Sequence, residues 1–124
     1  MKWEFSFIND NILVSTCAGE FSLDDLQTMA EELVSDSRWK PEKNLIIDFR
    51  EVIIDKIALD DIYSSLDVHR HFNDSVSGKI AVINKDHIGH GISSLYEIIS
   101  RQYIKSKYGS FINFDDALKW IREN

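Results

Sequence analysis

Chemistry-bearing side chains follow two short apolar runs, residues 45–47 and 79–83, which are typical of buried strands. Asp48 and Arg50 come after the first run, and a segment rich in histidine and glycine comes after the second. Because the carboxyl ends of parallel strands meet at one edge of a sheet, we expect a candidate ligand-binding cleft there, formed by Asp48, Arg50, His87, Gly89, His90 and Gly91. Backbone N–H groups at the start of the next helix would suit an anion or small ligand.

The two glycines of this segment have a second explanation, a tight turn. The pair Gly89-x-Gly91 lacks the third glycine of a dinucleotide fingerprint, and no Gly-x-x-x-x-Gly-Lys-Ser/Thr loop occurs in the sequence. We therefore expect no nucleotide or other cofactor.

The four histidines do not make a recognisable metal site. His69 and His71 are two residues apart in a segment with helical spacing, so their side chains diverge by about 160°. His87 and His90 are better spaced, but Asp86 is the one further ligand type beside them. We expect no metal ion, with His69 packed inside and the other three histidines facing solvent.

Nucleophilic groups give no enzyme signature either. Cys17 has apolar neighbours on a predicted strand, a context typical of a buried and inert thiol. No serine lies in a Gly-x-Ser-x-Gly turn. The remaining candidates are interpreted as a solvated helix face, comprising Asp24, Asp25, Glu31 and Glu32, and as packing aromatics, comprising Trp39 and Trp120.

Size and charge exclude several classes of protein. The chain has 124 residues, which predicts a single domain over residues 1–124. A net charge of −7 opposes binding to nucleic-acid phosphates. One cysteine, no signal sequence and no apolar run near the ~20 residues that span a bilayer predict a cytoplasmic protein without a membrane span.

The first half of the chain predicts a hairpin, a helix and a strand. Residues 3–8 alternate, with Trp3, Phe5 and Phe7 on one side, and residues 12–17 resume strand chemistry after a turn, up to Gly19. A weak capping box at Ser22 precedes a helix over residues 23–35. Residues 45–47 form a buried strand, and residues 51–59 are expected to be a loop with a helical turn.

The second half continues the alternation of helices and strands. A helix is expected from about residue 60, a strand over 79–83, and a long helix from about residue 92 to before Gly109. A short strand over 110–112 and a helix capped by Asn113 end the chain. The order ββαβαβαβα predicts an α/β fold with a mixed, mostly parallel five-stranded sheet, four helices and an antiparallel N-terminal hairpin.

Five segments, taken in order, resemble the SpoIIAA-like, STAS-type proteins, whose best-known members are bacterial anti-sigma factor antagonists. They are GEFSLDD (19–25), NLIIDFR (44–50), KIAVI (79–83), GISSLYE (91–97) and FINFDDALKWI (111–121). The resemblance covers nearly the whole chain and favours the stand-alone, uncharacterised branch of the group. It implies the fold above and a tendency to associate with proteins.

One departure from the family pattern bears on regulation. Regulatory STAS proteins carry an Asp-Ser-Ser/Thr-Gly-like segment after the middle strand, where a kinase modifies a hydroxyl. The comparable segment here, residues 54–58, reads IDKIA and has neither hydroxyl nor glycine. The phosphorylation switch is therefore not transferred, and Ser64 and Ser65 are interpreted as ordinary helix serines.

The leading hypothesis is a non-enzymatic domain that acts by protein association or by binding a small apolar or anionic ligand. A homodimer could form through the hairpin edge and its aromatic face, although a covering helix explains that face equally well. The first alternative is a carrier of a small apolar or lipid-like molecule, which requires a continuous cavity. The second is an enzyme, which requires Asp48, Arg50, His87 and His90 to face one cleft.

Overall fold

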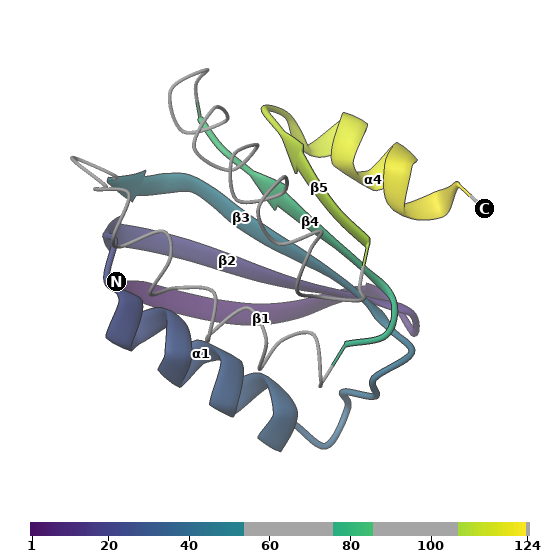
Figure 1. The fold of residues 1–124 in the computed structure, drawn as a ribbon, viewed down its shortest axis with the longest axis horizontal. Coiled ribbons are helices and arrows are strands. Elements are labelled where there is room, and N and C mark those ends of the chain that lie inside the picture. The colour runs from purple at the N-terminus through teal and green to yellow at the C-terminus, as the bar shows by residue number, and fades with distance from the viewer. Residues whose placement is uncertain (54–75, 86–106, 124) are drawn as a thin grey trace.

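The computed structural model describes residues 1–53, 76–85 and 107–123 (Figure 1). The elements in these ranges are the strands β1 (Lys2–Asn9), β2 (Ile12–Glu20), β3 (Asn44–Ile53), β4 (Lys79–Ile83) and β5 (Lys107–Phe111), and the helices α1 (Leu23–Ser35) and α4 (Phe114–Arg122). The predicted helix from about residue 60 lies outside the described residues, as does the predicted helix from about residue 92 up to residue 106. The expected extension of that second helix to just before Gly109 is wrong, because β5 begins at Lys107, three residues before the predicted strand over 110–112. Neither described helix is long and apolar enough to cross a membrane.

The sheet has the predicted topology. Its strand order is β1-β2-β3-β4-β5, with β1 antiparallel to β2 and the other neighbouring pairs parallel. The mixed, mostly parallel five-stranded sheet and its antiparallel hairpin are thus confirmed. The hairpin places β1 at one edge of the sheet and β5 lies at the other.

Two apolar clusters cover opposite faces of the sheet. On one face the inner residues of α1, which are Leu26, Met29, Ala30 and Leu33, pack against Leu13, Cys17, Leu45 and Ile47. On the other face Ala117 and Ile121 of α4 pack against Val14, Ile46 and Ile83. Figure 1 shows that α1 runs near β1 and α4 beside β5. The two helices therefore lie near opposite edges of the sheet as well as on opposite faces.

Both described helices begin at the predicted caps. Ser22 Oγ accepts a hydrogen bond from the Asp25 N–H at 3.3 Å, and Asn113 Oδ1 accepts one from the Asp116 N–H at 2.8 Å. These bonds satisfy N–H groups that have no partner within the helix, so the helix starts could be read from local sequence.

The loop predicted over residues 51–59 is wrong for its first three residues, because β3 continues to Ile53. β2 also extends past the predicted end at Gly19, which adopts a φ of 97° within the strand. The two extensions support each other, since Ala18, Gly19 and Glu20 pair with Glu51, Val52 and Ile53. Backbone pairing between strands distant in sequence therefore overrode the mixed composition of residues 51–53.

The aromatic face of the hairpin is turned inward. Trp3, Phe5 and Phe7 are half-buried and pack against the cluster beneath α1. Trp3 Nε1 also donates a hydrogen bond to Glu32 Oε2 on α1 at 2.6 Å. Of the two explanations for this face, covering by a helix is therefore confirmed.

Lys79 links the start of β4 to the end of α4. Its ammonium donates hydrogen bonds to the carbonyl oxygens of Trp120, at 2.7 Å, and Glu123, and lies 5.0 Å from the Trp120 ring centroid. A cation at this place satisfies carbonyl groups at the helix end and complements the negative end of the helix dipole.

Lys79→Met should lower the free energy of unfolding by about 1–2 kcal/mol, because the last carbonyl groups of α4 lose a charged donor. Urea unfolding followed by circular dichroism measures this loss. Lys119→Met is the matched control, since Lys119 is exposed in the same last turn of α4. Equal losses in the two variants would contradict a specific role for Lys79.

Candidate functional site

The structure describes two of the six predicted site residues, Asp48 and Arg50, both on β3. The other four, His87, Gly89, His90 and Gly91, lie outside the described residues, as do His69 and His71. The predicted convergence of all six on one cleft therefore stays a prediction. The carrier hypothesis also stays a prediction, because it depends on a cavity that the described residues do not define.

Asp48 and Arg50 pair with each other through a two-pronged contact, here called the β3 fork. Arg50 Nε donates to Asp48 Oδ1 at 3.0 Å and Nη2 donates to Oδ2 at 2.7 Å. The Arg50 backbone N–H also donates to Oδ1 at 3.1 Å. Residues two apart on a strand share a face, so β3 itself sets up this bidentate geometry.

The two partners of the β3 fork differ sharply in exposure. The Asp48 side chain is 9% exposed and the Arg50 side chain is 42% exposed. Asp48 lies between Thr16 on β2 and Ile83 on β4 in the sheet register. Arg50 reaches outward, with its guanidinium carbon 5.8 Å from the centroid of the Phe114 ring at the start of α4.

The buried carboxylate holds the guanidinium in one orientation. Of the five N–H donors of an arginine side chain, Asp48 takes one on Nε and one on Nη2, and no described residue accepts from Nη1. The same contact raises the pKa of Arg50, so its positive charge is permanent. The fork therefore presents an oriented, permanently charged donor edge that suits a carboxylate or phosphate.

The chain contains a second contact of the same kind at the end of α1, here called the α1 fork. Arg38 Nε donates to Asp36 Oδ1 at 3.1 Å and Nη2 to Oδ2 at 2.9 Å. Hydrogen bonds from Arg38 lower the pKa of Asp36 to about 2. The Arg38 side chain is more exposed, at 56%, and its guanidinium lies 4.7 Å from the Phe7 ring centroid. The α1 fork is thus a natural control for the β3 fork.

Sequence reasoning missed two neighbours of the candidate site. Phe114 is absent from the predicted set, yet its ring centroid lies 5.8 Å from the guanidinium carbon of Arg50. Asn84 directly follows β4, is 1% exposed, and its backbone N–H donates to the Phe111 carbonyl at 2.8 Å. A buried amide at the carboxyl end of a central strand is a local signal that could have added Asn84 to the candidate set.

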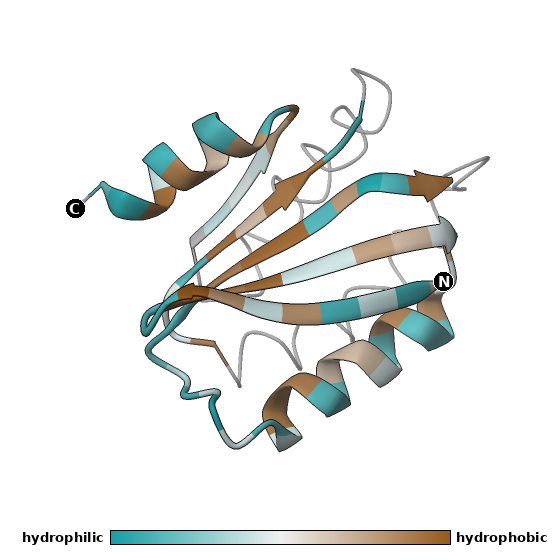
Figure 2. Ribbon diagram, turned by 180° about the vertical axis from the view of Figure 1, so that it is seen from behind, coloured by the Kyte–Doolittle hydropathy of each residue, from teal (hydrophilic) through white to brown (hydrophobic). Residues whose placement is uncertain are grey.

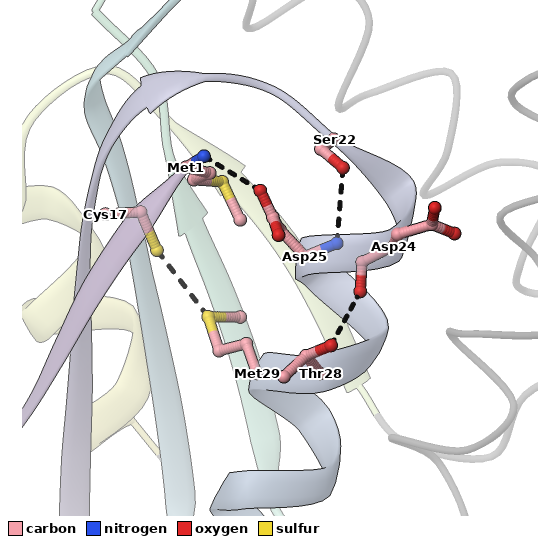
Figure 3. Close-up of polar contacts among 7 residues, drawn as sticks. All are labelled: Met1, Cys17, Ser22, Asp24, Asp25, Thr28 and Met29. Carbon is pink, nitrogen blue, oxygen red and sulfur yellow. Dashed lines mark hydrogen bonds and ion pairs between the residues drawn. The ribbon is translucent and has the colours of Figure 1, made fainter.

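Cys17 is buried beneath α1, as predicted for an inert thiol. Its Sγ lies 3.6 Å from Met29 Sδ (Figure 3). The Ser15 hydroxyl donates a hydrogen bond to Met29 Sδ at 3.0 Å. Burial raises the pKa of the Cys17 thiol to about 11, although the Ser15 hydrogen bond opposes part of this effect. The thiol is therefore protonated, and poorly nucleophilic, at neutral pH.

The helix face predicted to be solvated needs one correction. Asp24, Glu31 and Glu32 are exposed, but Asp25 is only half-exposed and its Oδ2 accepts a hydrogen bond from the Met1 nitrogen at 2.8 Å (Figure 3). The start of β1 packs against the first turn of α1 there, a contact between distant segments that helical periodicity does not reveal.

Among the residues that the structure describes, no cluster of His, Cys, Asp or Glu could hold a metal ion.

Cys17 should resist alkylation by iodoacetamide at pH 8 in the folded protein and react promptly in urea. The raised pKa also makes folding stability depend on pH: the contribution is complete below about pH 9 and is lost as the pH rises toward 11. Cys17→Ala should therefore lose less stability over that interval, by up to about 2–3 kcal/mol. Fast alkylation of the native protein at pH 8 would contradict this assignment.

Arg50→Met should destabilise the protein by about 1–3 kcal/mol, because it leaves the Asp48 carboxylate buried without its cation. This loss of stability is smaller than for a fully buried ion pair because Arg50 is half-exposed. Arg38→Met should cost clearly less stability than Arg50→Met, because the Arg38–Asp36 pair is screened by solvent. Adding Asp48→Asn to Arg50→Met should recover part of the loss. Urea unfolding of the four proteins, wild type included, tests this order.

Comparison with known proteins identifies the fold. The chain is similar to an uncharacterised protein of the DUF3478 family with a SpoIIAA-like fold from Shewanella loihica PV-4, with a TM-score of 0.63 and 18% identity over 97% of this chain and 92% of that one. It is also similar to the anti-sigma factor antagonist SpoIIAA in its unphosphorylated form, with a TM-score of 0.56 and 10% identity over 99% of this chain and 100% of that one.

No family model and no curated protein matches the sequence. At these identities the structural likeness establishes the fold and leaves the function to be argued from the site. The fold that the sequence segments implied is confirmed, and this chain has a SpoIIAA-like α/β fold.

Proposed function

We propose that the protein is a non-enzymatic binding domain in which Arg50 recognises an anionic group, a carboxylate or a phosphate, on its binding partner. The observation that carries this proposal is the β3 fork. A buried carboxylate orients a half-exposed guanidinium at the carboxyl end of a central parallel strand, the edge at which α/β sheets commonly bind ligands.

Stability alone is a weak reason for this pair. The neighbours of Asp48 on its face include Ile46 and Ile83, which are buried and apolar. Apolar residues at such a position are often as stabilising as a buried ion pair, because burying a carboxylate costs solvation energy. The fork is better explained by what Arg50 presents to the outside than by its contribution to the core.

The β3 fork also supports a binding role over a catalytic one. Both oxygens of Asp48 are engaged by Arg50, so the carboxylate is not held ready to accept a proton from a substrate. The name of the fold neighbour SpoIIAA, an anti-sigma factor antagonist, describes a protein that acts on another protein, which supports a protein as the carrier of the anionic group. His87 and His90 remain candidate contributors at the same edge.

The test is a titration of the ¹⁵N-labelled protein with inorganic phosphate and, separately, with succinate at constant ionic strength. We expect amide shifts concentrated on residues 48–51 and on Phe114, with a millimolar dissociation constant for at least one of the two anions. A stronger response to one anion identifies the preferred chemistry. The shifts should disappear in Arg50→Met and weaken in Arg50→Lys, because lysine keeps the charge but loses the planar donor edge.

Arg38→Met is the matched control, because the α1 fork has the same hydrogen-bond pattern outside the proposed site. It should leave the shifts around residues 48–51 unchanged. Equal loss of binding in both variants, or shifts spread over all cationic residues, would overturn the proposal. The dispersion of the amide spectrum shows whether each variant is folded.

A further inference from the structure

Half of one sheet face is open to solvent, here called the open half-face and defined by Thr16, Ala18, Glu51 and Ile53. The first three residues are exposed, and Ile53 is 60% exposed. All four lie on the face that α4 covers elsewhere, because their chain neighbours Cys17 and Val52 pack into the cluster on the α1 face. In Figure 2 the polar segment of β3 can be followed up to its hydrophobic tip at this end of the sheet.

Exposure of this kind is unusual for parallel strands. β2 and β3 pair in parallel along the whole open half-face, and parallel pairs normally have helices over both faces. α4 closes the adjoining part of the face against β4 and β5, where Ala81, Ile83 and Phe111 belong to its cluster. Among the described elements, none continues that helical layer over Thr16 and Ala18.

The border of the open half-face is acidic. In the sheet register Thr16 lies beside Glu4 on β1, and Ala18 lies beside Glu51 on β3. The exposed carboxylates around the small central residues are therefore Glu4, Glu20 and Glu51. Lys2 on β1 supplies one opposing charge, whereas the charge of Arg50 is matched by Asp48.

We propose that the open half-face docks an amphipathic helix of a partner protein, with small or apolar side chains toward Thr16 and Ala18 and Lys or Arg along its flanks. A helix about 10 Å wide covers two strands spaced about 4.8 Å apart. From Thr16 to Glu20 the strand spans about 13 Å, which matches roughly nine helical residues. The proposal goes beyond anion recognition by Arg50 and does not depend on it.

A second copy of this chain does not fit this surface. It would bring the same carboxylates together, on a chain whose net charge is already −7. Like charges opposed across an interface disfavour association, whereas flanking Lys or Arg residues complement the acidic border.

The probe is a synthetic amphipathic helical peptide with alanine and leucine on one face and lysine along both flanks. A second peptide with glutamate in place of lysine is the comparison. We expect the lysine peptide to shift the amides of Thr16, Ala18, Glu51 and Ile53, and Glu20→Lys/Glu51→Lys to weaken its binding about tenfold, by fluorescence anisotropy. The glutamate peptide should not bind.

The matched control is Glu31→Lys/Glu42→Lys, which reverses two exposed carboxylates outside the open half-face. It has the same net charge as the test variant, so it should keep the affinity of the lysine peptide within about twofold. Equal weakening in the two double variants, binding of the glutamate peptide, or shifts away from the open half-face would each overturn the proposal.

Two further measurements separate the alternatives. Arg50→Met should abolish the phosphate or succinate response but retain the lysine peptide, so failure of anion recognition and failure of helix docking give different results. Analytical ultracentrifugation measures the oligomeric state and so tests whether a second copy of this chain covers the open half-face. A dimer that Glu20→Lys/Glu51→Lys alters and Glu31→Lys/Glu42→Lys does not would assign the open half-face to a second copy and overturn a partner helix.

Discussion

One extra residue in β3 determines which side chains face solvent at the carboxyl end of the sheet. Thr16 pairs with Asp48 and Ala18 pairs with Glu51, so two steps along β2 match three steps along β3. This bulge lets Phe49 and Val52, three residues apart, both pack on the α1 face. Arg50 and Glu51 consequently both lie on the opposite face, where a regular strand would have placed only one of them.

That bulge concentrates polar groups at one end of a sheet whose other end is apolar. Before the bulge, Leu45, Ile46 and Ile47 are buried on both faces of β3. At the bulge, Asp48 is still buried but Arg50 reaches solvent, so the ion pair crosses the boundary between core and surface. The buried Asp48 carboxylate needs a cation to offset its lost solvation, and its two oxygens in turn fix the orientation of the Arg50 guanidinium.

The distribution of helices adds a second asymmetry. α1 lies near β1 and α4 beside β5, and each covers a different face. Among the described elements, α1 therefore packs against one side of the carboxyl halves of β2 and β3, and no helix covers the other side. The two solved structures share this fold with 18% and 10% identity, which is expected when a fold depends on apolar patterning rather than on particular residues. Function must accordingly be argued from groups such as the β3 fork.

The sequence by itself determined the features that depend on neighbours within a few residues. Alternation and helical spacing place the strands and both described helices, Ser22 and Asn113 cap those helices, and apolar runs mark the central strands. Asp48 and Arg50 could be named as candidates because they directly follow such a run. Tertiary structure alone decided the extension of β3 to Ile53, the bulge and the contact of Arg50 with Phe114. Those features arise from pairing and packing between segments far apart in the chain, whose energies no local pattern records.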